Sequence, residues 1–335
     1  MSAAEKAMRA AIDGFAGRHV VVVGDLILDE YLFGKPARIS REAPVLILRF
    51  AERQVFLGGA ANAAQNVHAL GARVTPLGVI GPDGAGDELV ALFSAAGIAT
   101  GGIVTERGRA TPVKTRIMAG GYQATRQQVV RLDREPAGEP QPTTEDALLE
   151  RLTALGPRVD AFVISDYGYG TVTPRIFEHV KAIARRANAL VSVDSRYQMP
   201  RFTGVTAATP NEAELEQLAG VPADDERTVE KAGRQVLERL DAKLLLVTRG
   251  SRGLALLERD GATTFIPMHG TDEIADVTGA GDTVISTFTL ALASGATPLQ
   301  AATLANVAGG LVVMKRGTAT VAPSELRQAI SLHDS

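Results

Sequence analysis

The residues with the clearest chemical potential lie in the run Asp276–Thr283, which has the sequence DVTGAGDT. Its glycines come directly before an apolar helical segment, and Asp282 stands at the junction. The first N–H groups of a helix have no partner within the helix, and the helix dipole makes that end locally positive. Because glycine has no Cβ, an anion such as phosphate can approach Gly279, Ala280 and Gly281 closely. Asp282 would then accept a proton from an attacking hydroxyl, which indicates phosphoryl transfer to an alcohol, although helix capping alone also favours an aspartate there.

A second group of small and polar residues begins at Gly58, where the sequence is GGAANAAQN. Gly58 and Gly59 come before a helix whose first turn contains only small residues, so a polar ligand can lie against the backbone. Asn62 offers both a donor and an acceptor to hydroxyl groups. We therefore predict that these three residues contact a hydroxylated substrate; tight helix packing is the alternative explanation for the small residues.

Carboxylates follow several short apolar runs. Asp25 and Asp166 each come directly after such a run, and Asp194 ends a third. Ligands of α/β proteins bind at the carboxyl ends of parallel strands, where a carboxylate can accept hydrogen bonds from a sugar diol. We predict that Asp25 and Asp166 bind the substrate, and that Asp29 is either a second contact or a turn residue.

Other residues suit a nucleotide and its metal ion. Asn211 and Glu214 have the spacing of a helix capping box, and they could equally arrange water around Mg²⁺ at the phosphates. The glycine-rich segment after an apolar run at 244–248 borders either a nucleotide or a plain hairpin, and Asn306 either faces the base or packs within its helix. The predicted nucleotide-binding residues are Asn211, Thr248, Gly250, Gly253 and Asn306.

Composition limits the classes of function. The 335-residue chain has a net charge of −3 and is 45% hydrophobic, so neither nucleic acid nor an anionic membrane is expected as a partner. It has no cysteine, which excludes disulfides, thiolate metal sites and cysteine nucleophiles. The first residues lack the apolar core of a secretory signal, no apolar run is long enough to cross a bilayer, and a cytoplasmic location is expected. The P-loop motif and the G-x-S-x-G motif are absent.

The elements that must hold these residues follow from hydrophobic patterning. Short apolar runs alternate with amphipathic segments, which predicts an α/β fold with a mainly parallel sheet covered on both faces. Two regions, at about 31–53 and 103–133, break this rhythm. We expect them to form antiparallel pairs that project as a small β lid, or else to be edge strands of the main sheet. Exposed lid strands would need a cover, from a ligand or a second subunit.

Four motifs resemble those of the ribokinase-like (PfkB) carbohydrate kinases, in the order that family has. LGGAANAAQNVHALGA at 57–72 and DVTGAGDT resemble its two signatures, GPDGAG at 81–86 its G-x-D-x-x-G segment, and Asn211–Glu214 its N-x-x-E motif. The resemblance covers nearly the whole chain. It implies one kinase domain over 1–335, with three α/β/α layers and a β lid, and it implies ATP and Mg²⁺ as cofactors.

Further segments resemble the kinase half of the heptose-7-phosphate kinases, which phosphorylate the anomeric hydroxyl of D-glycero-D-manno-heptose 7-phosphate. These segments lie at 24–48, 126–133, 165–170 and 315–321. The resemblance implies formation of the 1,7-bisphosphate by a kinase part without the adenylyltransferase domain fused in many relatives. Departures at 63–65 and 120–122 leave open a kinase for another sugar or nucleoside, such as fructose, ribose or a ketodeoxy acid. A non-catalytic nucleotide- or sugar-sensing protein is the more distant alternative.

The resemblance also assigns roles to individual residues. Asp25, Gly59, Asn62 and Asp166 would hold sugar hydroxyls, while Asp282 would act as the base. The backbone around Asp276 and Thr278, with the loop at 316–320, would bind K⁺. A homodimer is expected to form through the lid. The lid cations would bind a substrate phosphate or merely keep the lid soluble; they are Lys114, Arg116, Arg126 and Arg131.

Overall fold

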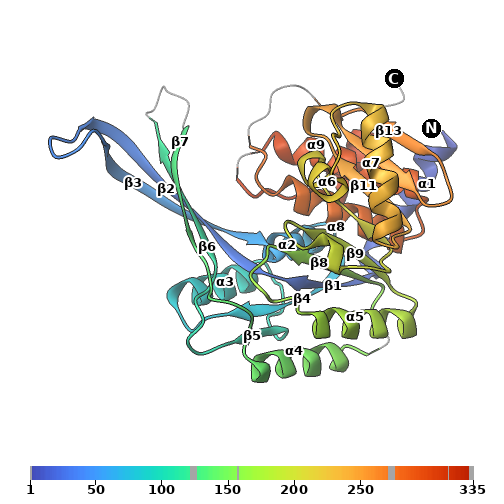
Figure 1. Ribbon diagram of the computed structural model, residues 1–335, viewed down its shortest axis with the longest axis horizontal. Coiled ribbons are helices and arrows are strands. Elements are labelled where there is room, and N and C mark those ends of the chain that lie inside the picture. Colours follow the sequence, from blue (N-terminus) through green and yellow to red (C-terminus); the bar gives the residue numbers. More distant parts are fainter. Residues whose placement is uncertain (1, 121–126, 157, 271–275, 316, 332–335) are drawn as a thin grey trace.

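The computed structural model describes residues 2–120, 127–156, 158–270, 276–315 and 317–331. These residues form two β-sheets with helices around the larger one (Figure 1). The larger sheet is parallel except at one edge, where β12 runs antiparallel to both of its neighbours, β11 and β13. In spatial order its strands are β13 (Thr263–Ile266), β12 (Leu254–Glu258), β11 (Leu244–Thr248), β10 (Ala207–Ala208), β9 (Leu190–Ser195), β8 (Ala161–Asp166), β1 (His19–Gly24), β4 (Arg73–Ile80) and β5 (Ile103–Thr105).

Helices cover both faces of this sheet because its central strands are apolar on both faces. In β1, Val20 and Val22 face one buried core while Val21 and Val23 face the other, as the period of two in a strand requires. The first core contains residues of α1 (Ala3–Asp13), α2 (Ala60–Ala69), α3 (Gly84–Ala95), α8 (Ala280–Ala293), α9 (Pro298–Val313) and α10 (Pro323–Ser331). The second contains residues of α4 (Pro142–Ala154), α5 (Pro174–Ala187), α6 (Glu212–Ala219) and α7 (Glu226–Arg239). The predicted three-layer α/β/α architecture is confirmed.

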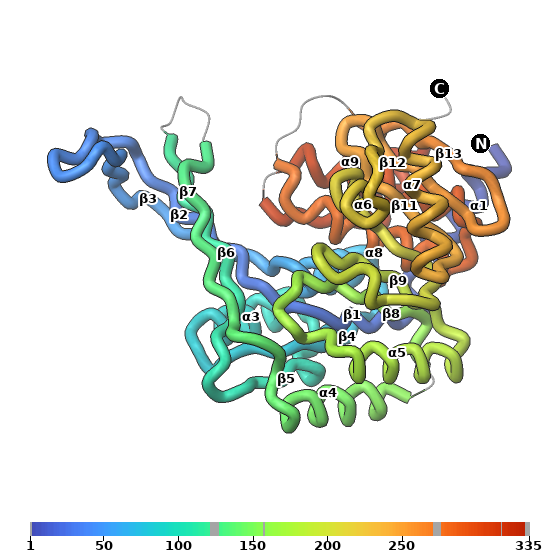
Figure 2. Tube along the Cα trace, viewed as in Figure 1, coloured from blue at the N-terminus to red at the C-terminus, as the bar shows by residue number. Residues whose placement is uncertain are grey.

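The smaller sheet, which we call the lid sheet, consists of β3 (Leu46–Gly59), β2 (Leu26–Ile39), β6 (Val113–Ala119) and β7 (Gln127–Arg134) in that order. It projects away from the helical layers (Figures 1 and 2), so the alternative of edge strands in the main sheet is wrong. The pairs β2–β3 and β6–β7 are antiparallel as predicted, but β2 and β6, which join them, run parallel. The strand β2 starts only two residues after β1 ends, and thus before the predicted boundary near residue 31.

Arg53 fastens the base of the lid sheet to helix α3 of the body. Arg53 on β3 donates to Glu30 on β2 at 2.6 Å and makes two bonds of 2.8 Å to Glu88 on α3. Tyr31 and Phe56 pack edge to face there, with ring centroids 5.6 Å apart. Among the residues described, no helix has the length and apolar character needed to cross a membrane.

Candidate active site

A cavity of about 450 Å³ lies at the carboxyl ends of the main-sheet strands, beneath the lid sheet. The loop after β8, the ends of β9 and β11, and the first turns of α6 and α8 contribute to its wall. The lid strands β2, β6 and β7 contribute Asp29, Lys114, Arg116 and Arg131. Residues distant in the sequence thus meet at the edge of the sheet where the strand-end carboxylates predicted a ligand.

Asp282 stands in the first turn of α8 at the wall of this cavity and is only 3% exposed. Its Oδ2 accepts a hydrogen bond from Asn62 Nδ2 at 2.8 Å, and its Oδ1 accepts one from the Tyr167 hydroxyl at 3.3 Å. Burial, with a smaller effect from the charge of Asp29, raises the pKa of Asp282 to about 7, against the opposing effects of these donors and Lys114. A carboxylate with this pKa can exchange a proton near neutral pH.

The donor beside Asp282 is held in a fixed orientation. Asn62 is fully buried in α2, and its Oδ1 and backbone carbonyl accept from Asn66 Nδ2 at 3.2 and 2.9 Å. Asn66 Oδ1 in turn accepts from the Thr283 hydroxyl at 2.9 Å, which links α2 back to α8. Because Oδ1 of Asn62 is already used as an acceptor, its amide nitrogen is the group that faces Asp282. Asn62, which was predicted to contact the substrate, therefore orients Asp282 in the structure.

Gly279 needs to be glycine for two reasons. It caps α8 in the left-handed region with φ of 80°. A Cβ built there would lie 2.5 Å from Asn62 Nδ2, the donor to Asp282. Gly279 and Gly281 line the cavity, as predicted for an anion site. The N–H of Ala280 donates to the carbonyl of Val277 at 3.3 Å, so an anion at that group would have to replace this bond.

Asp25 and Asp29, the two carboxylates that follow β1, have different roles in the structure. Asp25 is not among the residues lining the cavity; its two oxygens accept from the backbone N–H groups of Tyr167, Tyr169 and Thr171 at 2.8–3.2 Å. Asp25 therefore holds the loop after β8, a role that the sequence analysis missed. Asp29 does line the cavity and pairs with Arg116 at 2.6 Å.

The other predicted sugar ligands lie beside Asp29 or across the cavity. Gly59 lines the cavity, and a Cβ on Gly58 would lie 2.6 Å from Asp29 Oδ2, so Gly58 makes room for that carboxylate. Asp166 also lines the cavity and accepts from the Ser195 hydroxyl at 2.6 Å and from Gly168 N–H at 3.1 Å. Burial raises the pKa of Asp166.

The lid cations are used in different ways. Arg116 is paired with Asp29, and Arg131 with Asp133 at 3.0 Å. Lys114 lies 4.4 Å from the centre of the Tyr167 ring and is 8% exposed, and burial lowers its pKa. The predicted Arg126 lies outside the described residues. Arg196, an exposed residue that the sequence analysis missed, also lines the cavity; its position directly after the end of β9 at Ser195 was the available signal.

Two carboxylates in the wall of the cavity, Asp194 and Glu214, suit a divalent cation. Asn211 Oδ1 accepts from Glu214 N–H, and Glu214 Oε2 accepts from Asn211 N–H, both at 2.9 Å, so the capping box is confirmed. Burial raises the pKa of Glu214, and burial together with the charge of Glu214 raises the pKa of Asp194 well above its usual range. Mg²⁺ is commonly held by one or two carboxylates plus substrate phosphates, and this donor set fits it.

A smaller cavity of about 190 Å³ adjoins the first and shares Thr248, Val277 and Gly281 with it. Its wall comes from the β11–β12 turn, α8 and α9. It contains the remaining residues predicted to bind a nucleotide, which are Gly250, Gly253 and Asn306. The turn is a hairpin, as the structural alternative predicted. Asn306 donates to the carbonyl of Pro267, outside its own helix, at 2.6 Å.

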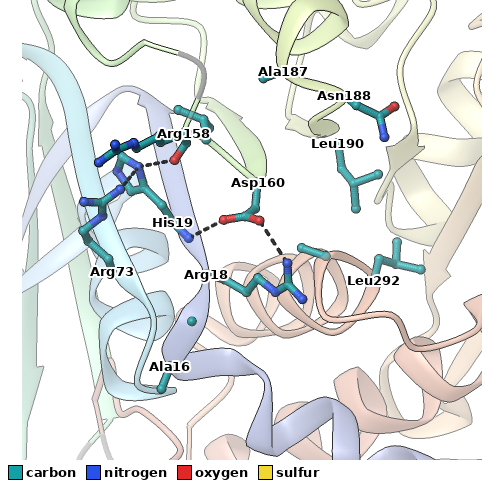
Figure 3. Close-up of a pocket in the computed structure, with 13 residues that line it drawn as sticks. Ala16, Arg18, His19, Arg73, Arg158, Asp160, Ala187, Asn188, Leu190 and Leu292 are labelled. Atoms are coloured by element: carbon teal, nitrogen blue, oxygen red, sulfur yellow. Dashed lines mark hydrogen bonds and ion pairs between the residues drawn. The ribbon is translucent and has the colours of Figure 1, made fainter.

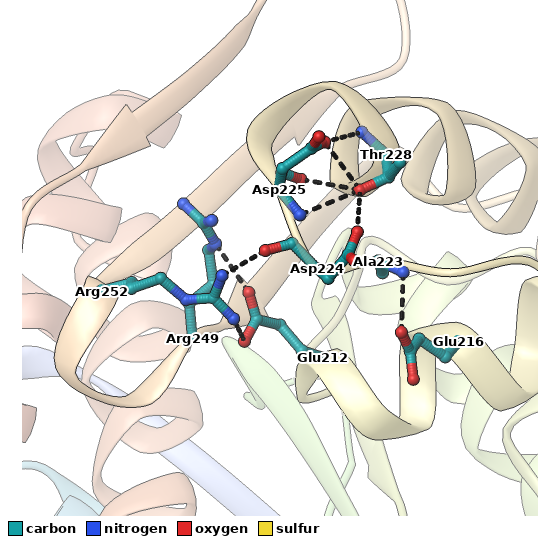
Figure 4. Close-up of polar contacts among 8 residues, drawn as sticks. All are labelled: Glu212, Glu216, Ala223, Asp224, Asp225, Thr228, Arg249 and Arg252. Carbon is teal, nitrogen blue, oxygen red and sulfur yellow. Dashed lines mark hydrogen bonds and ion pairs between the residues drawn. The ribbon is translucent and has the colours of Figure 1, made fainter.

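One carboxylate positions the β11–β12 turn (Figure 4). Glu212 in α6 accepts from Arg249 Nε at 2.9 Å and from Arg252 Nη2 at 2.6 Å. The Arg249 side chain is 4% exposed and lies 5.0 Å from the Phe265 ring centre. Glu216, one turn further along α6, accepts instead from Ala223 N–H at 2.8 Å. Because a buried guanidinium needs its partner, Glu212 fixes the turn that borders the smaller cavity.

The predicted potassium-binding segment is folded against the loop after α9. The Asp276 carboxylate accepts from Thr278 N–H at 2.9 Å and from Gly317 N–H at 3.2 Å. Thr278 lines the larger cavity. Arg316, in the predicted loop at 316–320, lies outside the described residues.

Comparison with known proteins adds a family match to this geometry. The model for the pfkB family of carbohydrate kinases matches residues 18–325. The bifunctional proteins HldE of Geobacter sulfurreducens and Mesorhizobium japonicum are each 40% identical over 92% and 96% of the chain, which spans 62% and 63% of their length. Arabidopsis thaliana ribokinase complexed with ribose and ATP is similar in fold, with a TM-score of 0.72 at 20% identity, over 94% of this chain and 97% of that one. Escherichia coli phosphofructokinase-2 has a TM-score of 0.78 at 18% sequence identity, over 95% of this chain and 100% of that one.

Proposed function

The chain belongs to the pfkB family of carbohydrate kinases, and from that premise we propose how and on what it acts. It transfers the γ-phosphoryl group of ATP to a sugar hydroxyl held in the 450 Å³ cavity, and residues 1–335 act as one kinase domain. The observation that carries this proposal is the placement of Asp282, a buried carboxylate with a pKa raised to about 7 at a helix N-terminus in that cavity.

Asp282 accepts the proton of the acceptor hydroxyl as its oxygen attacks the γ-phosphorus, and the bond from that phosphorus to the bridging oxygen of ADP breaks. Asn62 keeps the reacting carboxylate oriented through its 2.8 Å bond. Gly279, Ala280 and Gly281 present the N-terminus of α8 to the charge on the transferred group. Positioning and electrostatic stabilisation dominate catalysis of phosphoryl transfer.

The two adjoining cavities bind different parts of the two substrates. Adenine and ribose occupy the 190 Å³ cavity beside Thr248, Gly250, Gly253 and Asn306, and the phosphates pass the shared residues into the larger cavity. Mg²⁺ would be held near Asn211, Glu214 and Asp194, where it supplies positive charge to the phosphates. A potassium ion at the backbone of Asp276 and Thr278 would order the start of α8.

The sugar lies beneath the lid sheet, with Asp29, Gly59 and Asp166 as its hydroxyl ligands. Asn62, predicted as a further ligand, is fully buried and does not line the cavity, so its part is to orient Asp282. Asp29 is added to the predicted set because it lines the cavity, whereas Asp25 supports the sugar through the loop after β8. We propose the anomeric hydroxyl of D-glycero-D-manno-heptose 7-phosphate as the acceptor, on the resemblance of the sequence and its 40% identity to proteins named HldE.

The cations of the cavity support a phosphorylated acceptor. Lys114 and Arg196 line the cavity without a carboxylate partner in the part of the chain that the structure describes, and a phosphate suits both. Arg116 and Arg131 are the remaining predicted ligands of that phosphate. A kinase for fructose or ribose would need no such charge, whereas the carboxylate of a ketodeoxy acid could also bind these cations.

A homodimer through the lid sheet is the proposed assembly. Among the strands that the structure describes, the outer strands β3 and β7 each pair on one side only. Apolar side chains are also exposed on the lid sheet, which a second subunit would cover. They include Ile39 (68%), Phe50 (70%) and Leu132 (66%). We propose a cytoplasmic location, where ATP and sugar phosphates are available.

A panel of acceptors with coupled detection of ADP tests the proposed function. We expect turnover with the heptose 7-phosphate, and none with the unphosphorylated heptose at the same concentration. Preferential turnover of fructose, ribose or a ketodeoxy acid would replace the proposed acceptor while keeping the kinase. No ADP formation with any acceptor would support the sensing alternative.

A further inference from the structure

A third cavity, of about 800 Å³, lies at the amino ends of the main-sheet strands (Figure 3). Asp282 lies at the opposite, carboxyl ends of those strands. The third cavity is bordered by the amino ends of β1, β4, β8 and β9, where the chain contributes His19, Arg73, Asp160 and Leu190. The last turn of α8 closes one side, so this helix runs from the active-site cavity to this one. The proposed kinase reaction does not involve this cavity.

The cavity carries excess positive charge in a chain whose net charge is −3. Arg18, Arg73 and Arg158 line it, and Asp160 is the one carboxylate among the described residues of its wall. Asp160 accepts from Arg18 Nη1 at 3.0 Å and from the His19 N–H at 2.8 Å, so it is already used. Within the described ranges Arg73 and Arg158 pair with no carboxylate, and Arg18 Nε is a buried donor without a partner.

His19, which lies between two of these arginines, has conflicting contacts (Figure 3). Its Nε2 lies 2.9 Å from the Thr75 hydroxyl, while its Nδ1 lies 2.8 Å from Arg73 Nη2 and 3.1 Å from the carbonyl oxygen of Arg158. Without a proton, Nδ1 accepts from Arg73 and faces another acceptor. With a proton, it donates to the carbonyl and faces a cation. One contact is therefore unsatisfied in either state.

We propose that this cavity binds the phosphate group of a small anionic molecule through Arg73, Arg158 and Arg18. Guanidinium groups offer forked N–H donors that match phosphate oxygens, and unpaired cations in a concave site concentrate the field on an anion. A dianion that accepts from Arg73 also removes the conflict at His19, because Nδ1 can then carry a proton and donate to the Arg158 carbonyl.

The neutral ring can place its proton on Nδ1 by a change of tautomer, but the charge of a bound anion also favours uptake of a second proton by His19. Burial and the charge of Arg73 lower the pKa of His19, whereas the Arg158 carbonyl and Asp160 oppose that effect. A dianion beside Arg73 offsets the repulsion and raises the pKa of His19. Binding of an anion with constant charge should therefore strengthen as the pH falls from about 8 to about 6, the range around the ordinary histidine pKa.

Nuclear magnetic resonance of the histidine rings tests the proposal on the full chain, with the His19 signals assigned through His19→Gln. Inorganic phosphate, glycerol 3-phosphate and sulfate are titrated separately. We expect saturable shifts of the His19 signals, tighter sulfate binding at low pH, and about tenfold weaker binding in Arg73→Gln and in Arg158→Gln, the scale of one charged hydrogen bond. If glycerol 3-phosphate binds more tightly than inorganic phosphate, the ligand is a phosphorylated metabolite. If it binds equally or more weakly, the ligand is free phosphate.

Two control variants each remove one positive charge at a position outside this cavity. Arg227→Gln changes an exposed arginine of α7, and Lys114→Gln changes the active-site cavity; both should leave the His19 titration unchanged. The proposal is overturned if the His19 signals do not move at any soluble concentration of these anions. It is also overturned if Arg73→Gln and Arg227→Gln bind sulfate equally.

Discussion

Replacement of Asp282 by asparagine should change how the stability of the protein depends on pH. Burial raises the pKa of Asp282 from 3.8 to about 7. Between these values the folded state binds more protons than the unfolded state, so the free energy of unfolding decreases as the pH rises. The contribution is complete below the unfolded pKa and is lost as the pH rises through the folded one. A shift of about three pKa units corresponds to about 4 kcal/mol.

The assay is thermal unfolding of wild type and Asp282→Asn at pH values on either side of that range. For a chain of this length, about 4 kcal/mol corresponds to about 6 °C in Tm. At the acid end the side chain at 282 is neutral in both proteins, whereas at the alkaline end only wild type carries a buried charge there. We therefore expect the Tm of Asp282→Asn, measured relative to wild type, to be about 6 °C higher at the alkaline end than at the acid end. Asp87→Asn, at an exposed position on α3, is the matched control. An equal Tm difference at both pH values would refute the reasoning about the buried carboxylate.

Three further outcomes follow from the site. Because Asp282 must lose its proton to act as the base, kcat/KM should fall as the pH decreases below about 7; a flat profile from alkaline to acid pH would contradict this. Gly279→Ala places a methyl group 2.5 Å from Asn62 Nδ2 and should lower kcat by about 10²-fold, the cost of a displacement of about 1 Å; steady-state rates like those of wild type would oppose it. Glu212→Gln should raise KM for ATP about tenfold and change kcat less, whereas Glu216→Gln should leave both unchanged; equal effects of the two would remove the positioning role.

Short-range sequence patterns were sufficient to predict most helices and strands and the start of α8. Apolar runs before Asp25 and Asp166 predicted β1 and β8, and the glycines before Asp282 predicted a helix N-terminus, because strand period, turn chemistry and capping act over a few residues.

The rest depended on distant contacts. Asp25 and Asp29 are four residues apart, and the sequence favoured the first as a ligand. Only the pairing of β2 with β3 and β6 decides that Asp29 lies in the cavity, and the loop at 167–171 takes up both oxygens of Asp25. Arg196 and Tyr167 were likewise missed, because their roles come from the meeting of separate strand ends with α8.

The most direct test of the central claim measures transfer of the labelled γ-phosphoryl group of ATP to D-glycero-D-manno-heptose 7-phosphate by wild type and by Asp282→Asn. Binding of ATP and of the sugar phosphate to each protein is measured in parallel. We predict the 1,7-bisphosphate as the wild-type product, and a rate at least about 10²-fold lower in Asp282→Asn with both affinities retained. Transfer at the wild-type rate by Asp282→Asn would contradict the assignment of Asp282 as the base.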